Sequence, residues 1–358
     1  MKATDELHDL GQSLWLDNIT RDLLSDGTLA CYIRDFAITG LTSNPTIFDQ
    51  AIRTGSAYDA DIRLKTREGK SGEALFLELA LDDLRRAADL FRPIYDRTGG
   101  VDGWVSLEIS PLLADDGEGS TLEAVRLHSL TQRPNIFIKI PGTVAGLIAI
   151  EESIFRGVPV NVTLLFSRDQ YVAAANAYMR GIDRRLVADL DPNVVSVASL
   201  FVSRWDKAVL DKVPAALANR LGIAVARKAY AAYCDLLATP RWQALAKAGA
   251  RTQRLLWAST GTKDPAAPDT LYVEALAAPQ TINTLPDKTL LALADHGHLQ
   301  GMMPRDGGDA DRVLAEFARL GIDEAKLADK LQREGAAAFT KSWSDLLACI
   351  GEKSSTLK

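Results

Sequence analysis

Two kinds of hydrophobic segment alternate along the chain. Short runs rich in β-branched and aromatic residues occupy positions 13–17, 38–42, 104–109, 135–140, 160–166, 194–201, 254–258 and 280–284. Longer segments between them, at 73–90, 143–155, 168–186 and 222–237, repeat an apolar residue every three or four positions. The short runs predict strands and the longer segments predict helices. Strands that alternate with helices predict a parallel sheet covered by helices.

Eight predicted strands match the α/β fold class and, within it, the (β/α)8 TIM barrel, which typically takes about 250 residues. The chain has 358 residues, so we expect additional helices at about 45–67 and 311–350. No internal repeat, low-complexity tract or linker interrupts the pattern, and we therefore expect residues 1–358 to form a single barrel domain. The main alternative is a doubly wound open sheet. It is disfavoured because no GxGxxG motif follows a strand and Gly69-Lys70-Ser71 lacks the upstream glycine of a P-loop, Leu64 standing there.

The charge balance narrows the function classes. The chain has 41 basic and 47 acidic residues, a net charge of −6, which argues against a general nucleic-acid or membrane-surface role. Its three cysteines are far apart, which argues against a disulfide framework or a zinc site. Its six tryptophans form no stripe with basic residues, which argues against single-stranded nucleic-acid binding. No window reaches the roughly 20 apolar residues of a membrane helix, and the N-terminal segment has no apolar run typical of a signal peptide. These features predict a cytoplasmic protein.

Polar residues interrupt the apolar strands near their C-terminal ends, where barrel enzymes carry their active sites. They are Asp17, Thr42, Asn44, Glu108, Lys139, Thr163, Ser199 and, just beyond a strand, Arg204. Each has a structural explanation as well: Asp17 could cap a helix, Asn44 could start a turn, and Glu108 and Lys139 could form an internal ion pair. Their recurrence at equivalent ends of six strands favours a shared function.

Lys139 is the most informative of these residues. It lies among Ile138, Ile140 and other apolar neighbours, and burial there favours the neutral amine over the charged ammonium. A neutral amine is the nucleophile that Schiff-base chemistry requires. Proton transfers at the carbinolamine oxygen, and at the hydroxyl that becomes a carbonyl on bond cleavage, need acids and bases. Asp17 and Glu108 can divide these tasks.

Six segments in order, LWLDNI, GLTSNPTIF, VSLEIS, IFIKIPGT, NVTLLFS and ASLFVSRW, resemble the active-site segments of the transaldolase family. The resemblance covers residues 14–205 and implies a (β/α)8 barrel of the class I aldolase type. It implies a transferase that moves a dihydroxyacetone unit between sugar phosphates of the pentose phosphate pathway. The donor would be sedoheptulose 7-phosphate or fructose 6-phosphate, and the acceptor glyceraldehyde 3-phosphate or erythrose 4-phosphate. No cofactor and no metal would take part.

The resemblance also implies a role for each residue. Lys139 would form the Schiff base, Asp17 would take the proton of the C4 hydroxyl, and Glu108 and Thr163 would hold and use a water. Asn44 and Ser199 would bind the hydroxyls of the three-carbon unit, with Thr42 and Ser43 near them. Arg204 would bind the phosphate group.

Two positions bear on the choice of reaction. Phe201 matches an aromatic position that is Phe in transaldolases and often Tyr in fructose 6-phosphate aldolases, which favours transfer over simple cleavage. Many transaldolases carry a second phosphate-binding Arg after the seventh strand, whereas residues 258–263 here contain no Arg and end in Lys263. Lys263 could supply a point charge in its place. Cleavage of fructose 6-phosphate and a non-catalytic sugar-phosphate-binding barrel are the alternative functions.

Two further sequence features bear on metal binding and on oligomeric state. His296-Gly297-His298 is interpreted as a loop rather than a metal site, because no carboxylates with ligand spacing accompany it. The apolar stripe within residues 323–350 could cover either the barrel or a second copy of the chain, so a homodimer is left open.

Overall fold

Eight parallel strands close into a barrel in which each strand pairs with the strands that precede and follow it in the chain, and β8 pairs with β1. The computed structural model describes residues 2–357. The strands are β1 (Ser13–Asp17), β2 (Ile38–Thr42), β3 (Trp104–Glu108), β4 (Ile136–Pro141), β5 (Val160–Leu165), β6 (Ser196–Phe201), β7 (Arg254–Ala258) and β8 (Ile282–Leu285). The predicted fold class, a (β/α)8 TIM barrel, is confirmed.

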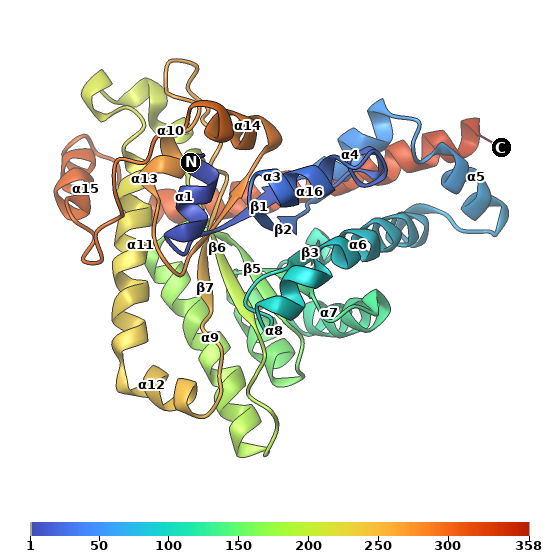
Figure 1. Cartoon of the computed structure of the whole chain (residues 1–358), viewed down its shortest axis with the longest axis horizontal. Helices are drawn as coiled ribbons and strands as arrows, with labels where there is room; N and C mark the ends of the chain where they lie inside the picture. The colour runs from blue at the N-terminus through green and yellow to red at the C-terminus, as the bar shows by residue number, and fades with distance from the viewer. Residues whose placement is uncertain (1, 358) are drawn as a thin grey trace.

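The helices surround the strands (Figure 1). The first half of the chain contributes α1 (Ala3–Asp9), α2 (Arg21–Ser25), α3 (Thr28–Asp35), α4 (Pro45–Thr54), α5 (Asp59–Arg67), α6 (Gly72–Arg97), α7 (Gly117–Thr131), α8 (Val144–Phe155) and α9 (Arg168–Val187). The second half contributes α10 (Ser203–Val209), α11 (Leu221–Ala238), α12 (Pro240–Lys247), α13 (Leu271–Ala275), α14 (Asp287–His296), α15 (Ala310–Arg319) and α16 (Glu324–Thr356). Short 3-10 turns are η1 (Pro111–Leu113), η2 (Leu210–Lys212) and η3 (Ala215–Leu217).

The bounds of β1, β2 and β7 match the sequence prediction, and those of the other five strands differ from it by one or two residues. The start of β4 is an example, because Asn135 was predicted inside the strand and lies just before it. Its side-chain amide donates hydrogen bonds to the carbonyls of Ala88, at 2.8 Å, and Gly103, at 2.9 Å. Asn135 therefore links the start of β4 to α6 and to the residue that precedes β3.

Helix α16 runs alongside α4 and ends near α5, at the far end of the molecule (Figure 1). Its buried residues include Leu331, Phe339, Trp343 and Leu346, and they pack on α4, α5, α6 and β5 of the same chain. The apolar stripe of this segment thus covers its own barrel.

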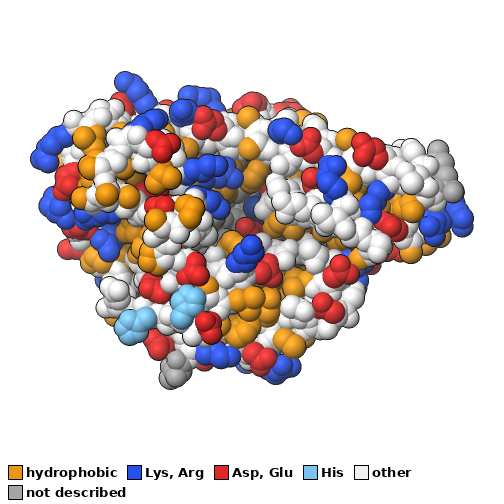
Figure 2. All heavy atoms as spheres, turned by 90° about the horizontal axis from the view of Figure 1, so that it is seen from above, with side chains coloured by type: hydrophobic (Ala, Val, Ile, Leu, Met, Phe, Trp, Pro, Cys, Tyr) orange, Lys and Arg blue, Asp and Glu red, His pale blue; other side chains and the backbone are white. Residues whose placement is uncertain are grey.

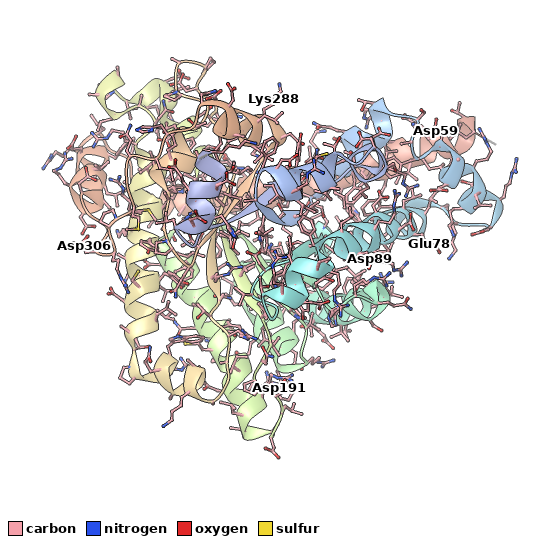
Figure 3. All side chains as sticks on the ribbon, viewed as in Figure 1. Asp59, Glu78, Asp89, Asp191, Lys288 and Asp306 are labelled. Carbon is pink, nitrogen blue, oxygen red and sulfur yellow. The ribbon has the colours of Figure 1, made fainter. Side chains whose placement is uncertain are left out.

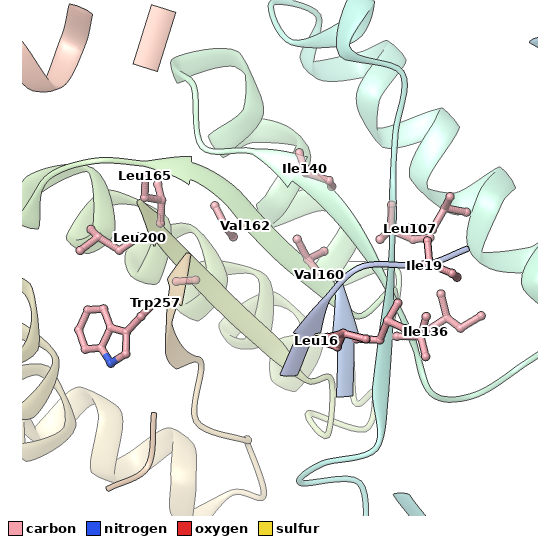
Figure 4. Packing of buried hydrophobic residues seen from close by; sticks show 14 of the residues in the cluster. Leu16, Ile19, Leu107, Ile136, Ile140, Val160, Val162, Leu165, Leu200 and Trp257 are labelled. Atoms are coloured by element: carbon pink, nitrogen blue, oxygen red, sulfur yellow. The ribbon is translucent and has the colours of Figure 1, made fainter. Parts of the chain in front are cut away.

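Two hydrophobic layers hold the barrel together. The outer layer lies between strands and helices and includes Leu16, Ile136, Val162, Leu200 and Trp257 (Figure 4). Charged side chains such as those labelled in Figure 3 project at the periphery, outside this layer.

The inner layer fills the barrel beneath the catalytic level. Phe137 stacks on Trp104 at 4.1 Å between ring centroids and lies 6.1 Å from Trp15. Gly40 on β2 faces the Trp15 indole so closely that an added Cβ would lie 2.6 Å from it. Because these large rings fill the lower barrel, the polar residues two to four positions further along the strands stand on an apolar floor.

Candidate active site

The polar residues predicted from the sequence meet at the C-terminal ends of the strands. Asp17 pairs in register with Thr42, and Glu108 with Lys139. A cavity of about 130 Å³ lies above the apolar floor. It is lined by Asp17, Thr42, Asn44, Lys139, Thr163, Ser199, Phe201, Arg204, Ala258, Ser259, Gly261, Lys263, Thr284, Pro286 and Phe339. The two remaining predicted residues contact the Lys139 amine, Glu108 through its carboxylate and Ser43 through its main-chain carbonyl.

The Lys139 amine is the centre of the cavity floor. The residue is 6% exposed, and its Nζ donates to Glu108 Oε2 at 3.2 Å and to the Ser43 carbonyl at 3.0 Å. Ser43 is held in turn by a 2.8 Å hydrogen bond from its hydroxyl to the Ser106 carbonyl. Two hydrogen bonds therefore hold the amine in place, and Lys139 still borders the cavity.

Two buried carboxyl groups lie near the amine, Glu108 on the adjacent strand β3 and Asp17 on β1. Burial raises the pKa of Asp17 above its ordinary value, while the charge of Lys139 and a hydrogen bond from Thr42 oppose that rise. Thr42 Oγ1 donates to Asp17 Oδ1 at 2.8 Å. Burial likewise raises the pKa of Glu108, against the attraction of Lys139. Both acids are thus closer to exchanging protons at neutral pH than an exposed carboxylate would be.

The β5 end supplies an unpaired hydroxyl. Thr163 Oγ1 is buried and has no hydrogen-bond partner among residues 2–357. The next residue, Leu164, has a left-handed backbone with φ of 58°, and the register of β5 with β6 shifts at this point. Gln332 of α16 secures the bend by donating to the carbonyls of Leu164 and Gly142, both at 3.0 Å. The irregular strand end leaves the Thr163 hydroxyl available to a bound molecule.

A second polar group on β5 was missed by the sequence analysis. Asn161 Oδ1 accepts a 2.7 Å hydrogen bond from Ser199, and its Nδ2 donates to Ser106 Oγ at 3.1 Å. This network fixes the Ser199 hydroxyl beside the cavity. An asparagine within the largely apolar run VNVTLL is the sequence feature from which Asn161 could have been predicted.

Asn44 lines the cavity and also caps α4, because its Oδ1 accepts the Ile47 amide at 3.2 Å.

Cations gather at the mouth of the cavity. The half-buried Arg204 guanidinium lies between the rings of Phe201, 4.9 Å from the centroid, and Phe339, at 5.9 Å. Burial lowers the pKa of Arg204, and partial burial together with Arg204 and Lys207 lowers the pKa of Lys263. No carboxylate among the described residues forms an ion pair with Arg204 or Lys263. Unpaired cations beside apolar rings are suited to an anionic ligand.

The molecular surface agrees with this charge distribution. Seen from above, it is hollowed near the middle, and Lys and Arg side chains gather on one side of the hollow (Figure 2).

Several lining residues could not be recognised as site residues in the sequence. Phe339 reads as an ordinary core position of an amphipathic helix, and it lies far from the strands in the chain. Thr284 lies within β8 and Pro286 directly follows it, and this strand has little polar contrast. Each enters the site because the barrel closes and α16 crosses its rim.

The histidine pair lies elsewhere. His296 ends α14, and its ring contacts Asp269 at 3.0 Å and Asp295 at 3.1 Å. Among residues 2–357 no group of three or more His, Cys, Asp or Glu side chains is placed to hold a metal ion. Within the same residues no helix is both long and apolar enough to cross a membrane.

A buried lysine between two buried acids, at the strand ends of a parallel barrel and beneath unpaired cations, is the arrangement of an aldolase-type barrel that forms a Schiff base with an anionic substrate. The profile of the Transaldolase/Fructose-6-phosphate aldolase family matches residues 14–350. The chain is 46% identical to a transaldolase of Frankia alni, over 97% of this chain and 96% of the relative. It is 45% identical to a transaldolase of Thiobacillus denitrificans, over 98% and 100%, and 43% identical to transaldolase 1 of Streptomyces avermitilis, over 97% and 94%. The chain belongs to the transaldolase/fructose-6-phosphate aldolase family.

Proposed function

We propose that this protein is a transaldolase of the pentose phosphate pathway. It transfers a dihydroxyacetone unit from sedoheptulose 7-phosphate or fructose 6-phosphate to glyceraldehyde 3-phosphate or erythrose 4-phosphate. The full-length similarity to proteins named transaldolase supports the activity. The observation that carries the proposal is the Lys139 amine, buried at the cavity floor between Glu108 and the Ser43 carbonyl.

Imine formation starts with this pair. The Lys139 ammonium passes a proton to Glu108, whose pKa is raised by burial, and the neutral amine adds to the C2 carbonyl of the ketose. A proton of the new ammonium nitrogen passes to the alkoxide, and Glu108 then returns its own proton to the resulting hydroxyl, which leaves as water and gives the iminium. Thr163, with its unpaired hydroxyl, holds that water until it is needed for hydrolysis.

Cleavage uses the other acid. Asp17 takes the proton of the C4 hydroxyl, the C3–C4 bond breaks, and its electron pair moves into the iminium to give an enamine. The shortened aldose phosphate leaves. The enamine carbon then attacks the aldehyde of the acceptor, and Asp17 returns the proton to the new hydroxyl. Asn44 and the Ser199 hydroxyl, fixed by Asn161, bind the hydroxyls of the three-carbon unit throughout.

The phosphate group lies at the mouth. Arg204 makes charge-assisted hydrogen bonds to it, and Lys263 supplies a second positive charge without the fork geometry of an arginine. Both are unpaired cations on the cavity wall, which supports this assignment.

Phe201 supports transfer over simple cleavage. Its ring packs on Phe166, at 5.2 Å between centroids, and on Arg204. A phenyl ring has no hydroxyl through which a proton could reach the enamine, so the intermediate persists until an aldehyde arrives.

We also propose a cytoplasmic location. A homodimer is a separate proposal, tested by sedimentation of the full chain.

The proposal is tested by reduction with borohydride in the presence of fructose 6-phosphate. Mass spectrometry of the digested protein should find a reduced three-carbon unit on the peptide that contains Lys139, and none in Lys139→Ala. Lys330→Ala, an exposed lysine of α16, is the matched control and should label like wild type.

The other outcomes discriminate the alternatives. Adding erythrose 4-phosphate to the wild type should yield sedoheptulose 7-phosphate. Free dihydroxyacetone instead would indicate a fructose 6-phosphate aldolase, and ligand binding without an adduct would indicate a non-catalytic barrel. An adduct on another lysine, with Lys139→Ala still active, would overturn the mechanism.

A further inference from the structure

A chain of hydroxyl groups reaches Asp17 from across the barrel closure. Asp17 ends β1, which lies between β2 and β8. Thr42 on β2 is 2.8 Å from Asp17 Oδ1, and Thr284 on β8 is 2.7 Å from Thr42, measured between the two hydroxyl oxygens. Both threonines are 3% exposed and line the cavity. Thr42 is the only hydrogen-bond partner of the Thr284 hydroxyl among residues 2–357.

Counting hydrogens gives this chain a direction. A hydroxyl has one hydrogen to donate, and an ionised carboxylate can only accept. The Thr42 hydrogen therefore points to Asp17 when Asp17 is ionised. Thr284 must then be the donor of the second hydrogen bond, because Thr42 has no hydrogen left.

We propose that Thr284 is a positioning residue for the proton transfer at Asp17, acting through Thr42. Its hydroxyl holds the Thr42 hydrogen toward the carboxylate and polarises it, which stabilises the ionised base that accepts the C4 proton. The inference rests on the proposed function, since it assigns Asp17 to cleavage. Lys139 and Glu108 lie on β4 and β3, and among residues 2–357 neither forms a hydrogen bond with Asp17, Thr42 or Thr284. We therefore expect imine formation to be insensitive to the Thr284 hydroxyl.

The matching variants are Thr284→Val, which keeps the shape and removes the hydroxyl, and Thr284→Ser, which keeps the hydroxyl. We expect Thr284→Val to lower kcat about 3- to 10-fold, the effect of one lost hydrogen bond, with KM within about 2-fold of wild type. The acid limb of its kcat profile should move to higher pH, because the ionised form of Asp17 loses support. Thr284→Ser should restore both.

Borohydride trapping separates cleavage from imine formation. With fructose 6-phosphate, Thr284→Val should form adduct at the wild-type rate but hold a larger share of it as the six-carbon species. Thr39→Val is the control, because Thr39 is a buried β2 threonine whose hydroxyl, within the described part of the chain, bonds only the Leu14 carbonyl, at 3.4 Å. It should match wild type. If Thr284→Val does not fold, Thr284→Ala removes the same hydroxyl with a smaller side chain.

The outcomes remain distinct from those for the function itself. A wild type that forms no adduct would refute the proposed function. A wild type that forms adduct, together with a Thr284→Val variant of unchanged pH profile and adduct ratio, would refute only the role of Thr284. Equal losses in the Val and Ser variants would show that packing, not the hydroxyl, matters, and would also overturn it.

Discussion

At the scale of single residues, the two acids of the site, Glu108 and Asp17, lie on different strands. Glu108 is the register neighbour of Lys139 and contacts its amine, whereas Asp17 is held by Thr42 and has no hydrogen bond to that amine. Burial raises the pKa of both. The difference in position supports the proposal that Glu108 carries the proton transfers near the amine and Asp17 those further along the sugar.

This division can be measured by weighing trapped intermediates. Asp17→Ala should still form an imine with fructose 6-phosphate but stall before cleavage, so the six-carbon adduct accumulates. Glu108→Ala should slow formation of any adduct, by about 10²–10⁴-fold for a lost general acid/base. A three-carbon adduct formed at the normal rate by Asp17→Ala would contradict the assignment.

At the scale of secondary-structure elements, the eight strands could be predicted because each is a short run rich in apolar or β-branched residues between turn-forming segments. The site residues on the strands could be predicted because a charged or polar side chain contrasts with such a run, as Lys139 does in IFIKI. That contrast is absent from α16, where Phe339 resembles every other core residue of an amphipathic helix. Long-range contacts of this kind follow from how α16 crosses the barrel rim, which no local pattern encodes.

The same helix offers a sharp test of its contribution. Gly335 lies against the barrel rim, where an added Cβ would be 2.9 Å from Leu164 Cδ2 and 3.1 Å from Arg204 Nη1. Gly335→Ala should therefore displace the guanidinium and raise KM for fructose 6-phosphate several-fold, with a smaller change in kcat.

Gly351 provides the matched control on the same helix, since an added Cβ there meets no atom within 4 Å. Gly351→Ala should leave KM unchanged and stabilise the fold by about 0.5–1 kcal/mol, the helix preference for Ala over Gly. Steady-state kinetics and thermal unfolding of both variants check the pair. Equal KM values for Gly335→Ala and wild type would exclude α16 from the phosphate site.

At the scale of the whole molecule, buried acids also set how stability depends on pH. Asp206 on α10 is 3% exposed and has no cationic partner among residues 2–357. Its carboxylate accepts hydrogen bonds from the Leu221 and Gly222 amides, at 2.9 and 3.1 Å, and from the Tyr272 hydroxyl, at 2.8 Å. Burial raises the pKa of Asp206 from 3.8 to about 6 in spite of these bonds. The Asp206 carboxylate therefore links α10, α11 and α13, and its ionisation above that pH lowers the free energy of unfolding.

The sign follows from proton binding. Between about pH 4 and 6 the folded protein holds a proton on Asp206 that the unfolded chain has released, so the free energy of unfolding falls as pH rises through this window. The loss attributable to Asp206 is at most about 3 kcal/mol. Asp206→Asn, which does not titrate, should show a shallower decline from pH 4 to 6.5 in denaturant unfolding. Parallel curves for the two proteins would contradict this account.

The late position of α16 in the chain has a consequence for synthesis. All eight strands precede this helix in the chain, so they emerge from the ribosome before it during synthesis. A nascent chain whose barrel has closed already holds Lys139, Asp17 and Glu108 at their places. It still lacks the Phe339 ring over Arg204 and the Gln332 amide that secures the bend in β5. We therefore expect the chain to retain a phosphorylated sugar only once α16 has emerged from the ribosome, after Lys139 is in place.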